Sequence, residues 1–152
     1  MELTNSQRLQ LEKLTDSQLL QLERATNKEL SMLLKKIRVL IPKEEIDKWS
    51  IKARNMTREE SRDFTVEFYK NFEEFGKLKD LDPASECVQE QVQKFRDYFE
   101  DTRCSCSTEF LGLLGKLYSE YFSYRKIIDD AGGVGTGEFF KKAVDIYVSK
   151  NE

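Results

Sequence analysis

Two cysteines separated by a single serine, Cys104 and Cys106, are the residues of this chain best suited to chemistry. An apolar stretch with helical spacing follows them, and Ser105 could cap it. With Ser105 as N-cap, the Cys106 sulfur would lie in the first turn, near unpaired backbone N–H groups and the positive end of the helix dipole. Both favour the thiolate, so we expect Cys106 to be the most reactive thiol. The alternative is that Cys106 is a small, buried apolar side chain.

The remaining composition excludes several kinds of catalytic and metal site. The chain has 3 cysteines and no histidine. Without an imidazole, the usual Ser-His-Asp and Cys-His arrangements are impossible, and the cysteines lack the fourth soft ligand of a structural zinc site. No phosphate-binding loop or dinucleotide fingerprint is found, because the glycines of residues 132–137 follow a helical stretch instead of a strand. We therefore predict a protein that is not an enzyme and that uses no metal or cofactor.

Apolar side chains at helical spacing predict an all-α fold, with four or five helices and no sheet over residues 57–149. Thr57 and Glu60 have the form of a capping box, which predicts the start of a helix with an aromatic stripe. Asp82 and Pro83 predict the start of the next helix. The glycine-rich residues 131–137 then separate the cysteine-containing helix from a last helix. The residues expected to face inward on these helices are Phe64, Phe68, Phe72, Phe75, Val88, Val92, Phe95, Phe99, Phe110, Leu114, Leu117, Tyr121, Phe139, Phe140, Ala143, Val144, Tyr147 and Val148.

The N-terminal third contains a repeat. Three similar units of 11 residues fill residues 3–35, each with a threonine followed by asparagine or aspartate near its start. Each unit either restarts a helix at a cap or continues one helix of 11-residue period, and the sequence leaves both open. Pro42 can begin a further helix. We expect residues 1–55 to form an amphipathic helical arm, which lies on the main domain or pairs with a second copy in a homodimer, and residues 56–152 to form a helical domain.

Charge and hydropathy bear on location and partners. No apolar run approaches the roughly 20 residues that span a bilayer, and the N-terminus lacks the apolar region of a signal peptide. We therefore expect a cytoplasmic protein without membrane contact. The formal net charge is −3 and no element for reading a DNA groove is visible, so we expect no direct DNA binding by this chain.

Over about residues 56–149 the chain resembles the TipAS antibiotic-recognition domain, the effector-binding half of certain MerR-type transcriptional activators. The resemblance is carried by the aromatic helix, by Asp82 to Glu86 at the start of the next helix, by Cys106 eight residues before Leu114-Gly115-Lys116-Leu117-Tyr118, and by Val134-Gly135 leading into residues 138–144. It implies a globin-like, all-helical fold. It also implies binding of thiopeptide antibiotics such as thiostrepton, or of other bulky peptide-like drugs.

Three positions depart from the family pattern. Phe95 stands where the resemblance implies a histidine pattern on the preceding helix. Ser105 replaces an aspartate, and serine can still cap a helix. Leu113 stands where the resemblance places the cysteine associated with covalent capture of the drug. Any complex is therefore expected to be non-covalent, unless Cys106 or Cys104 attacks instead. No MerR-type winged helix-turn-helix is visible before residue 56.

Two functions from different classes are consistent with these features. The first is recognition of a bulky, largely apolar, peptide-like antibiotic, in transcriptional regulation or in drug sequestration, in a cleft between the aromatic helix and the Cys106 helix. The second is a protein–protein or dimerisation module with no small-molecule ligand, in which the aromatic rings fill the core. The residues predicted to contribute to the cleft are Phe68, Phe72, Tyr98, Cys106, Phe110, Leu113 and Tyr118.

Overall fold

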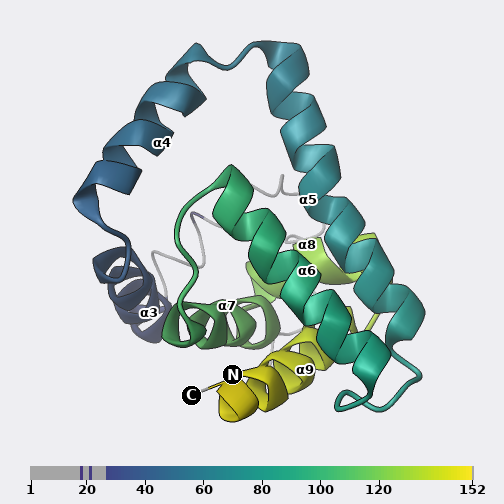
Figure 1. Ribbon diagram of the computed structural model, residues 1–152. Helices are drawn as coiled ribbons and strands as arrows, with labels where there is room; N and C mark the ends of the chain where they lie inside the picture. The colour runs from purple at the N-terminus through teal and green to yellow at the C-terminus, as the bar shows by residue number, and fades with distance from the viewer. Residues whose placement is uncertain (1–17, 19–20, 22–26, 152) are drawn as a thin grey trace, which may run out of the picture.

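A computed structural model describes residues 18, 21 and 27–151, and every regular element in this part of the chain is a helix (Figure 1). The helices are α3 (Lys28–Val39), α4 (Lys43–Asn55), α5 (Arg58–Leu78), α6 (Glu86–Thr102), α7 (Thr108–Glu120), α8 (Phe122–Gly132) and α9 (Thr136–Asn151). The predicted all-α class is confirmed. None of these helices combines the length and the hydropathy needed to cross a lipid bilayer.

Side-chain caps fix the starts of α3 and α5. At α3, the Asn27 side chain accepts the backbone N–H of Leu30 at 3.1 Å. In the third repeat unit a helix therefore begins at a cap, whereas of the first two units only residues 18 and 21 are among the described residues. At α5, the Thr57 hydroxyl accepts the backbone N–H of Glu60 at 3.1 Å and donates to the Glu60 carboxylate at the same distance. The helix start predicted from these two residues is confirmed.

The predicted start of α6 was wrong. The helix begins at Glu86, with Ser85 in the N-cap position, and not at Pro83. The Asp82 carboxylate accepts the backbone N–H of Ala84 at 2.9 Å, so it stabilises a turn two residues on instead of a helix start.

The break between α7 and α8 was not predicted. Tyr121 has extended backbone angles, φ −111° and ψ 123°, and thereby separates the two helices. Its side chain remains buried, so the expected inward face is kept through the break.

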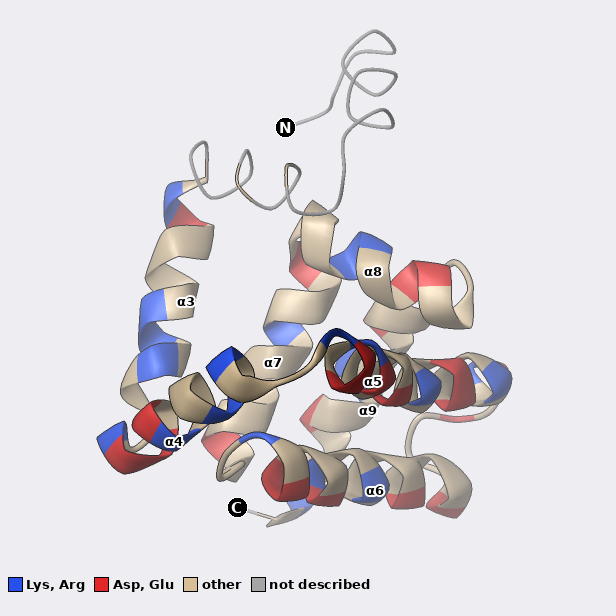
Figure 2. Ribbon diagram, turned by 90° about the horizontal axis from the view of Figure 1, so that it is seen from above, with Lys and Arg blue, Asp and Glu red and all other residues tan. Residues whose placement is uncertain are grey.

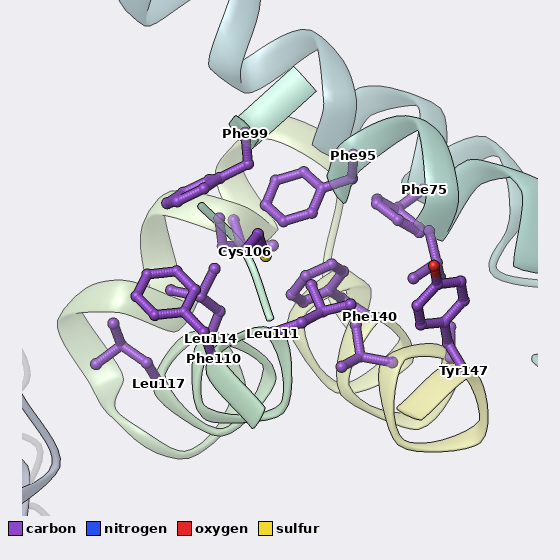
Figure 3. Packing of buried hydrophobic residues seen from close by; sticks show 14 of the residues in the cluster. Phe75, Phe95, Phe99, Cys106, Phe110, Leu111, Leu114, Leu117, Phe140 and Tyr147 are labelled. Atoms are coloured by element: carbon purple, nitrogen blue, oxygen red, sulfur yellow. The ribbon is translucent and has the colours of Figure 1, made fainter. Parts of the chain in front are cut away.

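The centre of the core lies among α5, α6, α7 and α9 and is rich in phenylalanine rings. The Phe140 ring centroid lies 5.3, 5.1 and 5.2 Å from those of Phe72, Phe75 and Phe95, and all four side chains are completely buried. Figure 3 shows Phe140 beside Phe75 and Phe95. Tilted and edge-on packing of this kind favours aromatic pairs beyond the area they bury. Of the residues expected to face inward, those that are only half-buried are Phe64, Phe68 and Val148.

The C-terminal half of α5 is fixed against α8 by a close backbone approach. A Cβ atom added to Gly76 would lie 2.1 Å from the carbonyl oxygen of Gly132. Beyond the end of α5, Lys79 Nζ donates to the carbonyl oxygens of Gly132 at 3.2 Å and Val134 at 3.0 Å. A cation at the C-terminal end of α8 complements the helix dipole and satisfies carbonyls that the helix leaves unpaired.

The two helices nearest the N-terminus of the described chain differ. Helix α3 packs beside α7 and buries Leu30, Leu33 and Ile37 in the common core. Helix α4 has no buried residue and bridges the distance between α3 and the N-terminal end of α5 (Figure 1). Lysine, arginine, aspartate and glutamate residues are frequent along α4, α5 and α6 and sparse on α7 (Figure 2). The division of the chain at residue 55 remains a prediction.

Candidate ligand-binding site

Residues 103–107 connect α6 to α7 and contain two of the three cysteines. The N-cap of α7 is Ser107, whose hydroxyl accepts the backbone N–H of Phe110 at 3.1 Å. The expectation that Ser105 caps this helix was therefore wrong. Cys106 precedes the cap and lies outside the first turn, so the helix N-terminus does not activate its thiol in the predicted way.

Burial dominates the chemistry of both thiols in this connection. Cys106 is only 1% exposed, and loss of solvation raises its pKa to about 12. Burial also raises the pKa of Cys104 to about 11, with a further contribution from the Glu45 carboxylate. The predicted preference of Cys106 for the thiolate was thus wrong, and the alternative of a small buried side chain holds. The exposed cysteine is Cys87, on α6.

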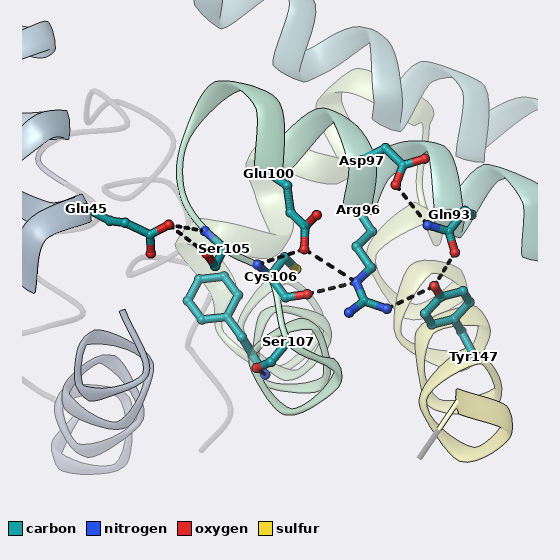
Figure 4. A network of polar contacts seen from close by, with 10 residues as sticks. Glu45, Gln93, Arg96, Asp97, Glu100, Ser105, Cys106, Ser107 and Tyr147 are labelled. Atoms are coloured by element: carbon teal, nitrogen blue, oxygen red, sulfur yellow. Dashed lines mark hydrogen bonds and ion pairs between the residues drawn. The ribbon is translucent and has the colours of Figure 1, made fainter. Parts of the chain in front are cut away.

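A polar network fastens the connection to α6 and α9 (Figure 4). Arg96 Nε donates to the carbonyl oxygen of Cys106 at 2.8 Å, and the Glu100 carboxylate accepts the backbone N–H of the same residue at 3.2 Å. The Arg96 guanidinium also donates to the Tyr147 hydroxyl at 3.1 Å, and this hydroxyl donates to the Gln93 side chain. The backbone at Cys106 is therefore held on both its donor and its acceptor side.

On its other side the connection is tied to α4. The backbone N–H and the hydroxyl of Ser105 both donate to one Glu45 carboxylate oxygen, at 3.2 and 2.6 Å (Figure 4). Further along α4, the Trp49 ring packs on Phe64 of α5 with centroids 5.1 Å apart. Helix α4 thus contacts the connection through the Glu45 carboxylate in its first turn and α5 through the Trp49 indole near its middle.

Next to the Trp49–Phe64 contact lies a group of four rings, Phe64, Phe68, Tyr98 and Phe99, which we call the aromatic box. The Arg103 guanidinium fills it, with its central carbon 4.1, 4.5, 5.6 and 5.4 Å from the respective ring centroids. These distances are within the range of cation–π attraction. Phe64, Phe68 and Tyr98 are half-buried, so the box is a partly open aromatic surface at the junction of α5 and α6.

The structure brings several of the predicted cleft residues together. The Tyr118 ring centroid lies 6.2 Å from that of Phe68 and 5.7 Å from that of Phe72, which joins α7 to α5. Burial raises the pKa of Tyr118, so its hydroxyl stays neutral. Tyr98 shares the Arg103 guanidinium with Phe68. Where α5 meets α7, however, the fully buried Phe72 makes the contact part of the core.

The other predicted residues make different contacts. Phe110 is buried against Phe99, at 5.5 Å between ring centroids, and Cys106 is buried in the same cluster (Figure 3). Leu113 points elsewhere: it lines a groove of about 260 Å³ between α3 and α7, together with Met32 and Leu33. The helical spacing that was expected to gather Phe110, Leu113 and Tyr118 thus distributes them over different surroundings.

Four contributors to this region were not among the predicted cleft residues. Phe64, one turn before Phe68 in the aromatic stripe, and Phe99 on α6 were expected only to face inward. Trp49 and Arg103 come from other elements, and the sequence carries no spacing that links them to the stripe. A second hollow, of about 480 Å³, has polar walls on α6 and α9 and includes none of the box residues. No group of three metal-ligating side chains is found among the described residues.

Comparison with known proteins identifies the family. The model of the TipAS antibiotic-recognition domain matches residues 42–147, so the match includes α4 and the whole aromatic box. No curated protein and no solved structure matches the chain. Because the matched segment covers well over half of the sequence, the chain belongs to the TipAS antibiotic-recognition domain family.

Proposed function

We propose that this chain recognises a bulky, largely apolar, peptide-like antibiotic of the thiopeptide kind, and that it does so at the aromatic box beneath α4. Family membership supports the ligand class. The cellular role would be transcriptional regulation or drug sequestration in the cytoplasm. In regulation, contact with DNA would be made by another domain or partner.

The observation that carries the proposal is the contrast between the box and α4. Phe64 and Phe68 keep part of their surface accessible, and α4, which reaches Phe64 through Trp49, has no buried residue. Large apolar ligands bind where aromatic side chains form a concave surface that can still lose contact with water. A macrocyclic ligand lying between α4 and the box would bury these rings and the Trp49 indole together.

Binding would also hold α4 in place. In the free chain α4 is fastened through Glu45 and Trp49, and a ligand that contacts both α4 and α5 adds a third attachment. A ligand shifts a conformational equilibrium only by its differential affinity for the two states. Contacts on both helices would supply this difference and connect recognition to a response.

Titration with thiostrepton tests the proposal. Trp49 is the only tryptophan of the chain and lies on a box ring, so its fluorescence should change saturably. Phe64→Ala and Phe68→Ala should each weaken binding by about tenfold or more, since each removes a contact ring. Val66→Ala, an exposed position of the same helix, is the matched control and should bind normally. Binding unchanged in both phenylalanine variants would place the ligand elsewhere.

The complex should be non-covalent. Leu113 carries no thiol, and the raised pKa values of Cys104 and Cys106 keep both thiols protonated near neutral pH. Mass spectrometry after incubation with thiostrepton should therefore show the unmodified chain. An adduct that disappears in Cys106→Ser would contradict this expectation and assign the attack to that thiol.

A second candidate function, a protein–protein module, is favoured by apolar side chains on α3 and α4. Met32 is 56%, Val39 82% and Ile51 55% exposed. Such residues suit a partner surface or a homodimer that includes the N-terminal arm. Light scattering on the purified chain would detect the dimer. Dissociation by Val39→Glu or Ile51→Glu would support this function, whereas a monomer at all concentrations would argue against self-association.

A further inference from the structure

We propose that the aromatic box is a subsite for a planar organic cation, such as a guanidinium or amidinium group, and that Arg103 occupies it in the free chain. The proposal rests on the proposed function, because it assigns one chemical group to a ligand of the same region. It goes further in naming a charge where the overall ligand is expected to be apolar.

The first argument is the number of rings around a single cation. The guanidinium carbon of Arg103 lies 4.1 Å from the Phe64 centroid and 4.5 Å from that of Phe68, with Tyr98 and Phe99 within 5.6 Å. Several aromatic faces directed at one position form the kind of cage that recognises organic cations. The box thus already shows which chemistry it accepts.

The second argument is that little else holds the Arg103 side chain. Among the described residues its guanidinium forms no ion pair, and its one hydrogen bond goes to the neighbouring Thr102 hydroxyl at 3.3 Å. Arg96, by comparison, combines hydrogen bonds to Cys106 and Tyr147 with a carboxylate 3.9 Å away. A cation held mainly by ring faces can be replaced by another planar cation of similar size, because no bond specific to arginine is lost.

The third argument is an unused polar atom in the wall of the box. The Tyr98 hydroxyl oxygen is buried and has no hydrogen-bond partner in the part of the chain that the structure describes. A buried hydroxyl without a partner is unfavourable, and most such groups in proteins are satisfied. The Arg103 guanidinium lies in the box but does not bond this oxygen, whereas a free amidinium or guanidinium is not tethered to the backbone and could turn one of its N–H donors toward it.

The fourth argument concerns what happens when Arg103 leaves. The adjoining connection is held through Ser105 by Glu45 and through Cys106 by Arg96 and Glu100, none of which involves the Arg103 side chain. The guanidinium can therefore move out of the box while residues 104–107 keep their positions. Displacement of one side chain is all that the ligand cation requires.

The test empties the box and offers it small cations. In the full-length Arg103→Ala chain, methylguanidinium should cause a saturable change in Trp49 fluorescence at millimolar concentration, because Trp49 packs on Phe64. The wild-type chain should respond at least about tenfold more weakly, since the added cation must compete with Arg103. Methylurea, which has nearly the same shape but no charge, should bind neither chain. Arg62→Ala, at an exposed position of α5, controls for the loss of a positive charge and should behave as wild type.

Two further variants keep the test decisive. Arg103→Gln retains most of the stem and replaces Arg103→Ala if circular dichroism shows that the latter is unfolded. Adding Phe68→Ala to Arg103→Ala should abolish methylguanidinium binding. Adding Tyr98→Phe to Arg103→Ala should weaken this binding severalfold. The proposal is overturned if methylurea binds as well as methylguanidinium, or if no saturable binding occurs in either Arg103 variant. Because no antibiotic is used, a chain that binds thiostrepton but fails this test refutes the cation subsite alone.

Discussion

Both halves of α5 carry phenylalanine at helical spacing, but the rings of the two halves have different surroundings. In the C-terminal half, Phe72 and Phe75 are completely buried where the backbone of α8 approaches at Gly132. In the N-terminal half, Phe64 and Phe68 stay half-buried beneath one indole and one guanidinium. What lies over a ring, and not the spacing of the ring itself, decides whether it is core or binding surface.

The largest effect should come from emptying the core half. Phe72→Ala should lower the free energy of unfolding by about 3–5 kcal/mol, the usual cost of removing a buried phenylalanine ring. Phe68→Ala should cost less than half of that, because its ring is already partly in water. Urea denaturation followed by circular dichroism measures both. Equal losses of unfolding free energy at the two positions would mean that both rings belong to the core.

The next largest effect on stability should come from adding a methyl group at Gly76, where the backbones of α5 and α8 approach each other. Gly76→Ala should destabilise the fold by about 1–3 kcal/mol, because its Cβ would meet backbone that cannot move aside. Gly112→Ala, on α7, is the matched control: its nearest neighbour would be a Val148 methyl group at 3.9 Å, an ordinary contact. There the helix propensity of alanine should leave stability unchanged or slightly higher. A neutral Gly76→Ala would show that α5 and α8 are less tightly fixed than the geometry requires.

Alkaline pH should lower the stability of the fold through the two buried thiols, Cys104 and Cys106. Unfolded thiols ionise near pH 9.0, whereas in the folded chain the pKa of Cys104 is about 11 and that of Cys106 about 12. The folded state therefore binds more protons above pH 9, and the stability from these groups is lost as pH rises through 11 and 12. Unfolding curves at pH 8 and pH 10.5 should show a smaller pH effect in Cys106→Ala than in wild type. An identical pH effect in the two chains would mean that Cys106 ionises freely.

The difference in exposure between Cys87 and the other two cysteines predicts the order in which the three thiols are modified. At pH 8, the exposed Cys87 should react quickly with a disulfide reagent, and the two buried thiols slowly. Cys87→Ser should remove the fast phase. A fast phase that survives this substitution would show that the connection between α6 and α7 opens readily.

The smallest effect should come from releasing α4. Glu45→Ala removes the acceptor of both Ser105 hydrogen bonds, and should cost about 1 kcal/mol or less because the contact is solvent-exposed. Amide hydrogen exchange should nevertheless speed up along α4 while that of α5 stays unchanged from Phe72 onward. Glu44→Ala, at an exposed position whose side chain has no hydrogen-bond or ion-pair partner among the described residues, is the control. Faster exchange along the whole of α5 would mean that the two halves are not independent.

The sequence predicted the fold correctly where residues within a single helix determine its start or its buried face. The Thr57 and Glu60 pair fixed the start of α5, and apolar spacing identified the buried faces of α6, α7 and α9. Sequence reasoning went wrong where two residues were equally able to act. Ser105 and Ser107 can both cap a helix. Because the Ser105 hydroxyl donates to the carboxylate of Glu45, 60 residues earlier, the cap of α7 is Ser107.

For the candidate site, the sequence supplied the rings but not their grouping. Phe68 and Tyr98 were both predicted, and both contact Arg103. Arg103 itself had no signal, because a cation over an aromatic face leaves no periodic pattern in a sequence. Leu113 was placed with Phe110 by helical spacing, yet the position of α3 gives it a different neighbourhood. Tertiary packing, which spacing within one helix does not encode, decided each of these cases.

The lack of any buried residue in α4 has a consequence for how this protein can evolve. Substitutions at exposed positions without special contacts usually change stability by no more than about 0.5 kcal/mol. Variation along α4 can therefore accumulate without bringing the fold near the threshold at which it fails. A lineage built on this plan can alter the surface that faces a new compound while the phenylalanine core stays as it is.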